Sequence, residues 1–313
     1  MWFKNLTLFR LSEPFSLSPD DLHQRLEEGR FRPCGSMELA SYGWVAPLGR
    51  DHDALVYSAG NCFMVCFRKE EKLLPASVVN DVVAQRAEEA EERQGVPLGR
   101  RERAQLRDDV VTELMPKAFT QSRKTYAYID AKSGWIVVDS AGVKKAEDLV
   151  SHLRRCLGSL PALPPATRER PSAVMTQWLA SASVAADFAL EDECELRSTD
   201  AEGSSVRCKR QDLTAPEVQN HLQAGKVVVR MALNWSDRIG FLLGDDLSVK
   251  RLKFLDVVQE RAAEVDAADE AQRFDVDFSI LSLELSAFIP RLMALFGGEI
   301  ESQKSGGSVV GLQ

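Results

Sequence analysis

Residues 75–115 constrain the fold of this chain most, because they have the composition of long helices but few large apolar side chains. Ala, Glu, Arg and Gln recur there at helical spacing, and the sequence Gly95-Val96-Pro97-Leu98-Gly99 interrupts the pattern. Glycine and proline end helices, so the segment predicts two helices joined by a short connection. A helix pair with so little apolar surface has little to bury in a core. We therefore expect residues 76–115 to form a helical hairpin that projects from the body of the protein.

Strands and amphipathic helices are expected on both sides of this hairpin. Ser18, followed by Pro19 and two aspartates, is typical of a helix start, and that helix should run to about residue 28. A second helix, at 144–157, is indicated by one apolar face, consisting of Ala146, Leu149, Val150, Leu153 and Leu157. Strands are predicted at 4–11, 54–57, 62–68, 125–130 and 134–139.

The second half of the chain follows a segment crowded with prolines, Pro161, Pro164, Pro165 and Pro171, which indicates a linker. Ser172 is expected to cap a short helix, and Thr214 with Glu217 matches a capping box that opens another. Strands are predicted at 226–233, 238–243 and 249–254, and a last helix at 278–296.

The expected fold class is α+β, with antiparallel sheets and packed helices in two main parts plus the projecting hairpin. The expected division is a central α+β domain at 1–75 and 116–165, the hairpin tip at 76–115, a second α+β domain at 166–300 and a flexible tail at 301–313.

Several functional classes lack their sequence signatures. Phosphate-binding G-x-x-x-x-G-K-[ST] and G-x-G-x-x-G loops are absent, as are the hydrolase motifs G-x-S-x-G and H-E-x-x-H. The six cysteines form no C-x-x-C pair, which argues against a zinc site and a disulfide framework and favours reduced thiols in the cytoplasm. No signal peptide or membrane span is expected, and neither are a cofactor, a metal site or catalysis.

Two local clusters leave alternatives open. Arg50-Asp51-His52-Asp53 offers carboxylates and an imidazole that suit a metal for phosphodiester cleavage, but a polar loop before a strand has the same composition. Cys62 and Cys66 share one face of a strand, where buried thiols are more common than metal ligands.

The net charge of −8 is unevenly distributed, because residues 187–202 and 256–277 each carry a net charge of −6 and the rest of the chain is therefore positive. Three basic clusters stand out, and each suits a polyanion as well as an ordinary solvated surface. They are Lys117 with Arg123 and Lys124, then Arg207 with Lys209 and Arg210, and finally Lys250, Arg251 and Lys253. In the third, alternation should place Lys250, Leu252 and Phe254 on one side of a strand. Phe119, beside the first cluster, is either a contact residue or part of the core.

Longer motifs resemble a known family from end to end. In order, they are MWFKNL, GWVAPLG, RKEEKLLP, LMPKAF, KKAEDLVSHLRRCLGSLP, KRQDLTAPEVQNHLQAGKVV, DDLSVKRLKFLD and QRFDVDF. With them the chain resembles the RdgC family of bacterial recombination-associated proteins over nearly its whole length.

The resemblance implies a nucleoid-associated, cytoplasmic DNA-binding protein that is not an enzyme. It implies a ring-shaped homodimer that encircles duplex DNA without sequence preference and limits the access of the RecA recombinase. By its motifs, the resemblance places DNA contact and ring function on Phe119, Arg210 and Gln211, with Lys117, Arg123, Lys124 and Lys209 beside them. Single-stranded DNA is a further possible partner. The alternative is a protein-interaction factor that acts on a recombinase directly and binds DNA weakly.

Overall fold

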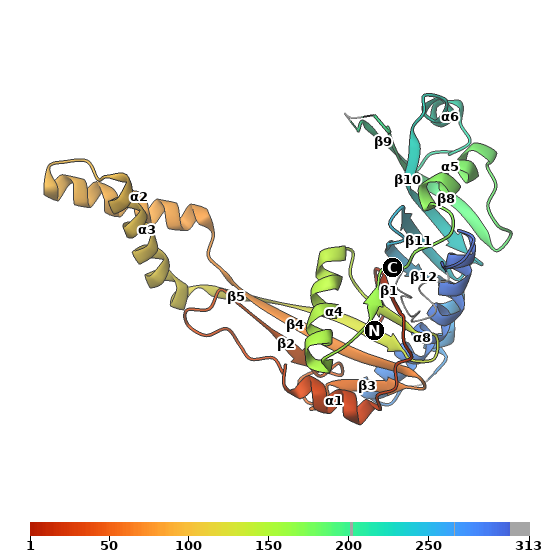
Figure 1. Cartoon of the computed structure of the whole chain (residues 1–313), viewed down its shortest axis with the longest axis horizontal. Helices are drawn as coiled ribbons and strands as arrows, with labels where there is room; N and C mark the ends of the chain where they lie inside the picture. Colours follow the sequence, from red (N-terminus) through yellow and green to blue (C-terminus); the bar gives the residue numbers. More distant parts are fainter. Residues whose placement is uncertain (201–202, 266, 301–313) are drawn as a thin grey trace, which may run out of the picture.

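The computed structural model describes residues 1–200, 203–265 and 267–300. Its elements form a crescent, in which a helical arm lies at one end and a smaller sheet at the other (Figure 1). The two sheets are antiparallel and are covered by helices, so the α+β fold class is confirmed. The expected tail at 301–313 lies outside the described residues.

The first sheet has seven strands in the order β2-β4-β5-β6-β1-β7, with β3 paired to β4. Its strands are β1 (Thr7–Leu11), β2 (Ala40–Val45), β3 (Val56–Ala59), β4 (Cys62–Leu73), β5 (Phe119–Asp130), β6 (Trp135–Val138) and β7 (Ala162–Leu163). The expected strands are all present, but the prediction missed β2 and β7 and placed the start of β5 six residues too late.

One face of the first sheet packs on α1 (Pro19–Glu27) and α4 (Val143–Leu157). Ser18 caps α1 by accepting a hydrogen bond of 3.1 Å from the backbone N–H of Asp21, as predicted. All five apolar residues that predicted the inner face of α4 are buried. The core expected for this part of the chain is therefore present.

The arm consists of α2 (Ala76–Gln94) and α3 (Arg100–Leu114), which confirms the helical hairpin. Gly95 ends α2 with φ of 71°, a left-handed conformation that favours glycine. Only Val79, Ala87 and Val110 are buried in the two helices, and the arm projects from the sheet as expected (Figure 1).

The second sheet has five strands in the order β12-β11-β10-β8-β9. They are β8 (Phe188–Arg197), β9 (Ser205–Lys209), β10 (Val227–Trp235), β11 (Ile239–Gly244) and β12 (Val249–Phe254). Its helices are α5 (Pro171–Ser181), α6 (Pro216–Gln223), α7 (Asp256–Ala263) and α8 (Glu270–Ala294). One continuous core joins this sheet and these helices to the second face of the first sheet. The division into domains near residue 165 remains a prediction.

Several details of this half differ from the sequence prediction. Arg170, not Ser172, stands at the N-cap of α5, because Pro171 takes the first helical position. Thr214 does not cap α6, because its hydroxyl donates to Asp212 Oδ1 at 2.7 Å instead. Helix α8 begins eight residues before the predicted start, where Asp269 caps it through the backbone N–H of Gln272.

The N-terminal segment extends the second sheet beyond β12. Leu6 and Val249 exchange backbone hydrogen bonds of 2.7 and 3.0 Å, and Leu252 N–H donates to the carbonyl of Lys4 at 2.8 Å. Arg251 between them has φ of 51° and forms a bulge. The prediction that Lys250 shares a side of β12 with Leu252 and Phe254 is therefore wrong. Because of the bulge, Val249 is buried on that side with them instead.

Candidate nucleic-acid interface

The first group of candidate residues lies on a two-stranded ribbon that leads from the first sheet to the arm. β4 and β5 pair without interruption from Cys62↔Asp130 to Leu73↔Phe119. The β5 end of this ribbon carries what we call the ribbon cluster, consisting of Lys117, Phe119, Arg123 and Lys124. Lys117 lies just before β5, in the short 3₁₀ helix η1 (Met115–Lys117).

Phe119 lies on the face of the ribbon that also carries Arg123, because alternate residues of a strand share a face. Its side chain is 84% exposed, and the paired Leu73 is 48% exposed. Arg123 donates to Gln121 Oε1 at 2.9 Å on the same face and has no acidic partner within the described residues. The alternative that Phe119 belongs to the core is therefore wrong for the single subunit.

Lys124 lies on the opposite face of the ribbon. It lines a cavity of about 460 Å³ together with Arg68, Ser122, Arg30 and Arg50. Across the regions that the structure covers, Lys124 has no ion-pair partner. The face is strongly basic, so it suits an anion.

Carboxylates also stand at this cavity: Asp53 lines it, Glu27 pairs with Arg30, and the buried Glu70 pairs with Arg68. The backbone N–H of Cys34 donates to Glu70 at 3.0 Å, Ser122 Oγ at 2.9 Å and Arg68 Nη2 at 2.9 Å. These donors, that of Cys34 first, hold the pKa of Glu70 below its ordinary value against the opposing effect of burial. Glu70 is thus a charged anchor that fixes Arg68.

Lys117 is less available than the other cations of the ribbon cluster. Its Nζ lies 3.2 Å from Glu113 Oε1, one helical turn earlier. Both side chains are exposed, so this ion pair contributes little to stability, and a phosphate can replace it.

The second group, Lys209, Arg210 and Gln211, lies at the end of β9 and in the turn that follows; we call it the turn cluster. Lys209 Nζ is 4.0 Å from Glu193 Oε1, and Gln211 Nε2 donates to Glu217 Oε1 at 2.8 Å. Arg210 is exposed and, among residues that the structure places, has no acidic partner. Its φ of 51° turns the chain at this point.

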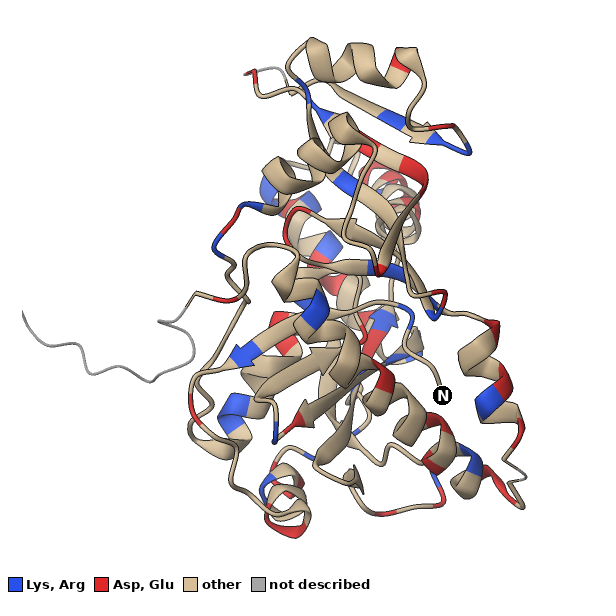
Figure 2. Ribbon diagram, turned by 90° about the vertical axis from the view of Figure 1, so that its right-hand side faces the viewer, with Lys and Arg blue, Asp and Glu red and all other residues tan. Residues whose placement is uncertain are grey.

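Part of the acidic run that contains β8 is neutralised by cations of neighbouring strands. Glu195 accepts from Arg207 at 2.7 Å and from Arg230 at 2.9 Å, and Glu193 pairs with Arg251 at 2.8 Å. Burial opposes ionisation of Glu195, but Arg207 and Arg230 together hold its pKa below the ordinary value. Figure 2 likewise shows acidic and basic residues interspersed rather than divided between two faces. Sequence reasoning missed Arg230 because its partner lies on another strand.

The structure does not bring the ribbon cluster and the turn cluster together. β5 leads to the arm at one end of the crescent, and β9 lies at the other end (Figure 1). Any single ligand that contacts both clusters must therefore be long, or two copies of the chain must share it.

The Arg50–Asp53 loop forms part of the same basic cavity as Lys124, and Arg30 Nη2 donates to the carbonyl of Asp53 at 2.9 Å. Four cationic side chains around the loop make it a poor place for a metal cation. Within the ranges 1–200, 203–265 and 267–300, no three His, Cys, Asp or Glu side chains are placed to share a metal ion. Cys62 and Cys66 are buried, and burial raises the pKa of each thiol to about 12.

The fold and these surfaces define the class of the protein. It is an antiparallel α+β protein with a projecting arm and two separate basic clusters. A family model described as "Putative exonuclease, RdgC" matches residues 1–299. Recombination-associated protein RdgC of Aeromonas hydrophila is 43% identical over 302 residues, which covers 96% of this chain and all of that protein. The protein of the same name from Pseudomonas aeruginosa is 45% identical over 300 residues, covering 96% of this chain and 98% of that one. The chain belongs to the RdgC family, and its relatives' name supports a role in recombination.

None of the helices in the described ranges combines the length and the apolar character that crossing a membrane requires.

Proposed function

We propose that this protein binds duplex DNA without sequence preference, as a ring-shaped homodimer of the nucleoid, and limits the access of the RecA recombinase to DNA. The observation that carries the proposal is the exposure of three candidate cations and their lack of acidic partners. Arg123, Lys124 and Arg210 are exposed and have no acidic partner within the described residues, in a chain of net charge −8. Such cations bind phosphates and release counterions, which gives affinity without sequence information.

The crescent shape supports the ring. A two-fold axis that crosses the opening of the crescent would set each end against the same end of a second copy. Both contacts would then be isologous, and the two crescents would enclose a hole. Phe119 near the arm is an apolar side chain of the kind that anchors such a contact.

The alternative, a protein-interaction factor that presents acidic runs to a basic partner, has less support. Asp187, Glu193 and Glu195 of the first acidic run already pair with cations of this chain. Their charge is therefore largely committed within the fold.

Catalysis is not part of the proposal, although the matching family model carries the description of an exonuclease. The basic surroundings of Asp53 disfavour metal-dependent cleavage there. Incubation of the purified protein with labelled DNA and magnesium or manganese tests this point. Cleavage that Asp53→Ala abolishes would restore the nuclease hypothesis.

The test of DNA binding is a titration of duplexes of unrelated sequence at several salt concentrations. The logarithm of the association constant should fall linearly with the logarithm of salt concentration, with a slope of about −0.9 for each phosphate contacted. Different sequences should give nearly equal constants. A dissociation constant that salt does not change contradicts the proposal.

A further inference from the structure

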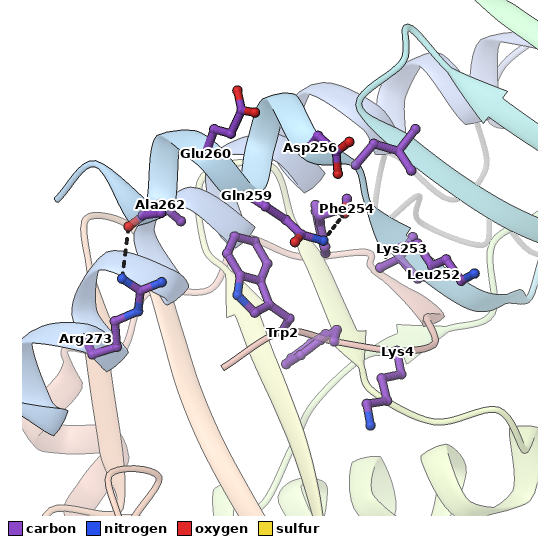
Figure 3. A pocket seen from close by; sticks show the side chains of 13 residues that line it. Trp2, Lys4, Leu252, Lys253, Phe254, Asp256, Gln259, Glu260, Ala262 and Arg273 are labelled. Carbon is purple, nitrogen blue, oxygen red and sulfur yellow. Dashed lines mark hydrogen bonds between the residues drawn. The ribbon is translucent and has the colours of Figure 1, made fainter.

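A cavity of about 770 Å³ lies between the N-terminal segment, the end of β12 and helix α7 (Figure 3). Trp2 and Lys4 come from the first segment, and Phe254 ends β12. Asp256 and Gln259 come from α7. The cavity belongs neither to the ribbon cluster nor to the turn cluster. Three segments that carry the family resemblance, MWFKNL, DDLSVKRLKFLD and QRFDVDF, contribute to its lining.

The cavity contains an aromatic platform. The indole of Trp2 lies 4.8 Å from the ring of Phe254, centroid to centroid, at an interplanar angle of 49°. Phe254 is buried and fixes the platform, whereas Trp2 remains half-buried. Figure 3 shows the indole in the middle of the cavity, between α7 and Lys4. The indole N–H has no acceptor in the described part of the chain, so Trp2 is available to a ligand.

Charges of opposite sign flank this platform on different sides. Lys4 and Lys253 are exposed on the same side of Trp2 in Figure 3, and neither has an acidic partner among the described residues. The α7 side carries the carboxylates of Asp256 and Glu260. The remaining cation, Arg273, is occupied, because it donates to the carbonyl of Ala262 at 3.0 Å and pairs with Asp277. A matching ligand is flat and aromatic, with an anion on one side and hydrogen-bond donors on the other.

We propose that this cavity binds one unpaired nucleotide of a DNA strand, an inference that rests on the proposed function. The base stacks on Trp2, its phosphate contacts Lys4 and Lys253, and an N–H donor, which every DNA base has on its ring or its exocyclic nitrogen, donates to Asp256 or Glu260. Base–aromatic stacking tolerates any sequence, which agrees with binding that lacks sequence preference. The volume is within the range that holds small organic ligands. The cavity gives the protein a preference for duplexes with a single-stranded end.

The test compares a blunt duplex with the same duplex carrying a single-stranded overhang, using the full chain. Trp2→Ala should weaken binding of the overhang duplex roughly 5- to 150-fold, the loss expected for one stacked base, and leave binding of the blunt duplex unchanged. Trp2→Phe keeps an aromatic face and should retain most of the affinity. The double variant Lys4→Ala/Lys253→Ala should resemble Trp2→Ala. Lys250→Ala, a cation of the same strand outside the cavity, is the matched control.

Tryptophan fluorescence supplies a second readout that needs no destabilising substitution. The other four tryptophans, Trp44, Trp135, Trp178 and Trp235, are buried. Overhang DNA should therefore quench the emission of Trp2 in the unmodified protein, and Trp2→Phe should abolish the quenching. The inference is wrong if blunt and overhang duplexes behave alike in both readouts, or if an acidic peptide quenches Trp2 and an oligonucleotide does not. Failure to bind the blunt duplex at all contradicts the proposed function instead.

Discussion

Phe119→Ala separates folding from assembly, because this side chain is 84% exposed in the single subunit. Its removal leaves no cavity, so the free energy of unfolding of the subunit should change by no more than about 0.5 kcal/mol. Burying a phenylalanine against a partner is worth about 2 kcal/mol. An isologous contact buries one from each copy, so the dimer should lose about 4 kcal/mol. The dimer dissociation constant should then rise roughly a thousandfold.

Sedimentation equilibrium over a range of protein concentrations measures this change. Leu283→Ala is the matched control, because Leu283 is also exposed and apolar but lies within α8, far from the arm (Figure 1). The control should dimerise like the unmodified protein. DNA retention on circular and linear duplex should fall together with dimerisation for Phe119→Ala. Unchanged dimerisation of this variant would remove Phe119 from the interface, and a lower melting temperature would show that the side chain packs within the subunit.

Three further predictions concern charge. Arg210→Ala should make the slope of log affinity against log salt less steep by about one while sedimentation stays unchanged, as expected for one lost phosphate contact. The pKa of Glu70 is lower in the folded protein than its ordinary value of 4.5, so the ionised carboxylate stabilises the fold at pH values above 4.5. This contribution to the free energy of unfolding is lost as the pH falls through the folded pKa. In urea unfolding, the Glu70→Gln variant should be less stable than the unmodified protein at neutral pH, and its stability should not show this loss in acid. Arg238→Ala should cost at most about 3–5 kcal/mol in urea unfolding, because the buried carboxylate of Glu284 then keeps only Arg261, at 3.5 Å, as a cationic partner. Arg291→Ala, at an exposed pair, should cost much less. Equal losses for these two variants would contradict the difference in burial.

Local patterns predicted much of the fold. The inner face of α4, the capped start of α1 and the hairpin of α2 and α3 depend on residues a few positions apart, so the sequence alone indicates them. The prediction failed where the structure of a segment depends on residues far away in the sequence. Residues 119–124 look polar because the ribbon is solvated on both faces, which hides the alternation of a strand. β8 looked like an acidic run because the cations that neutralise Glu193 and Glu195 lie on β9, β10 and β12.

The candidate site shows the same limit. Sequence motifs selected Phe119 and Arg210, and both are exposed in the structure. They did not indicate that Lys124 lies on the opposite face of the ribbon from Arg123, since that depends on where β5 begins. The cavity around Trp2 was not predicted either, because its walls are separated by about 250 residues in the chain.

The pairing of Leu6 with Val249 has a consequence for biosynthesis. A ribosome adds about 5–20 residues per second, so a nascent N-terminal segment waits roughly 12–50 s before its partner strand is made. During that interval Leu6 lacks its backbone partner, and Phe3 and Leu6, both buried in the finished protein, lack the part of their packing that β12 provides. The newly made N-terminus is therefore a natural target for chaperones until the last strands leave the ribosome.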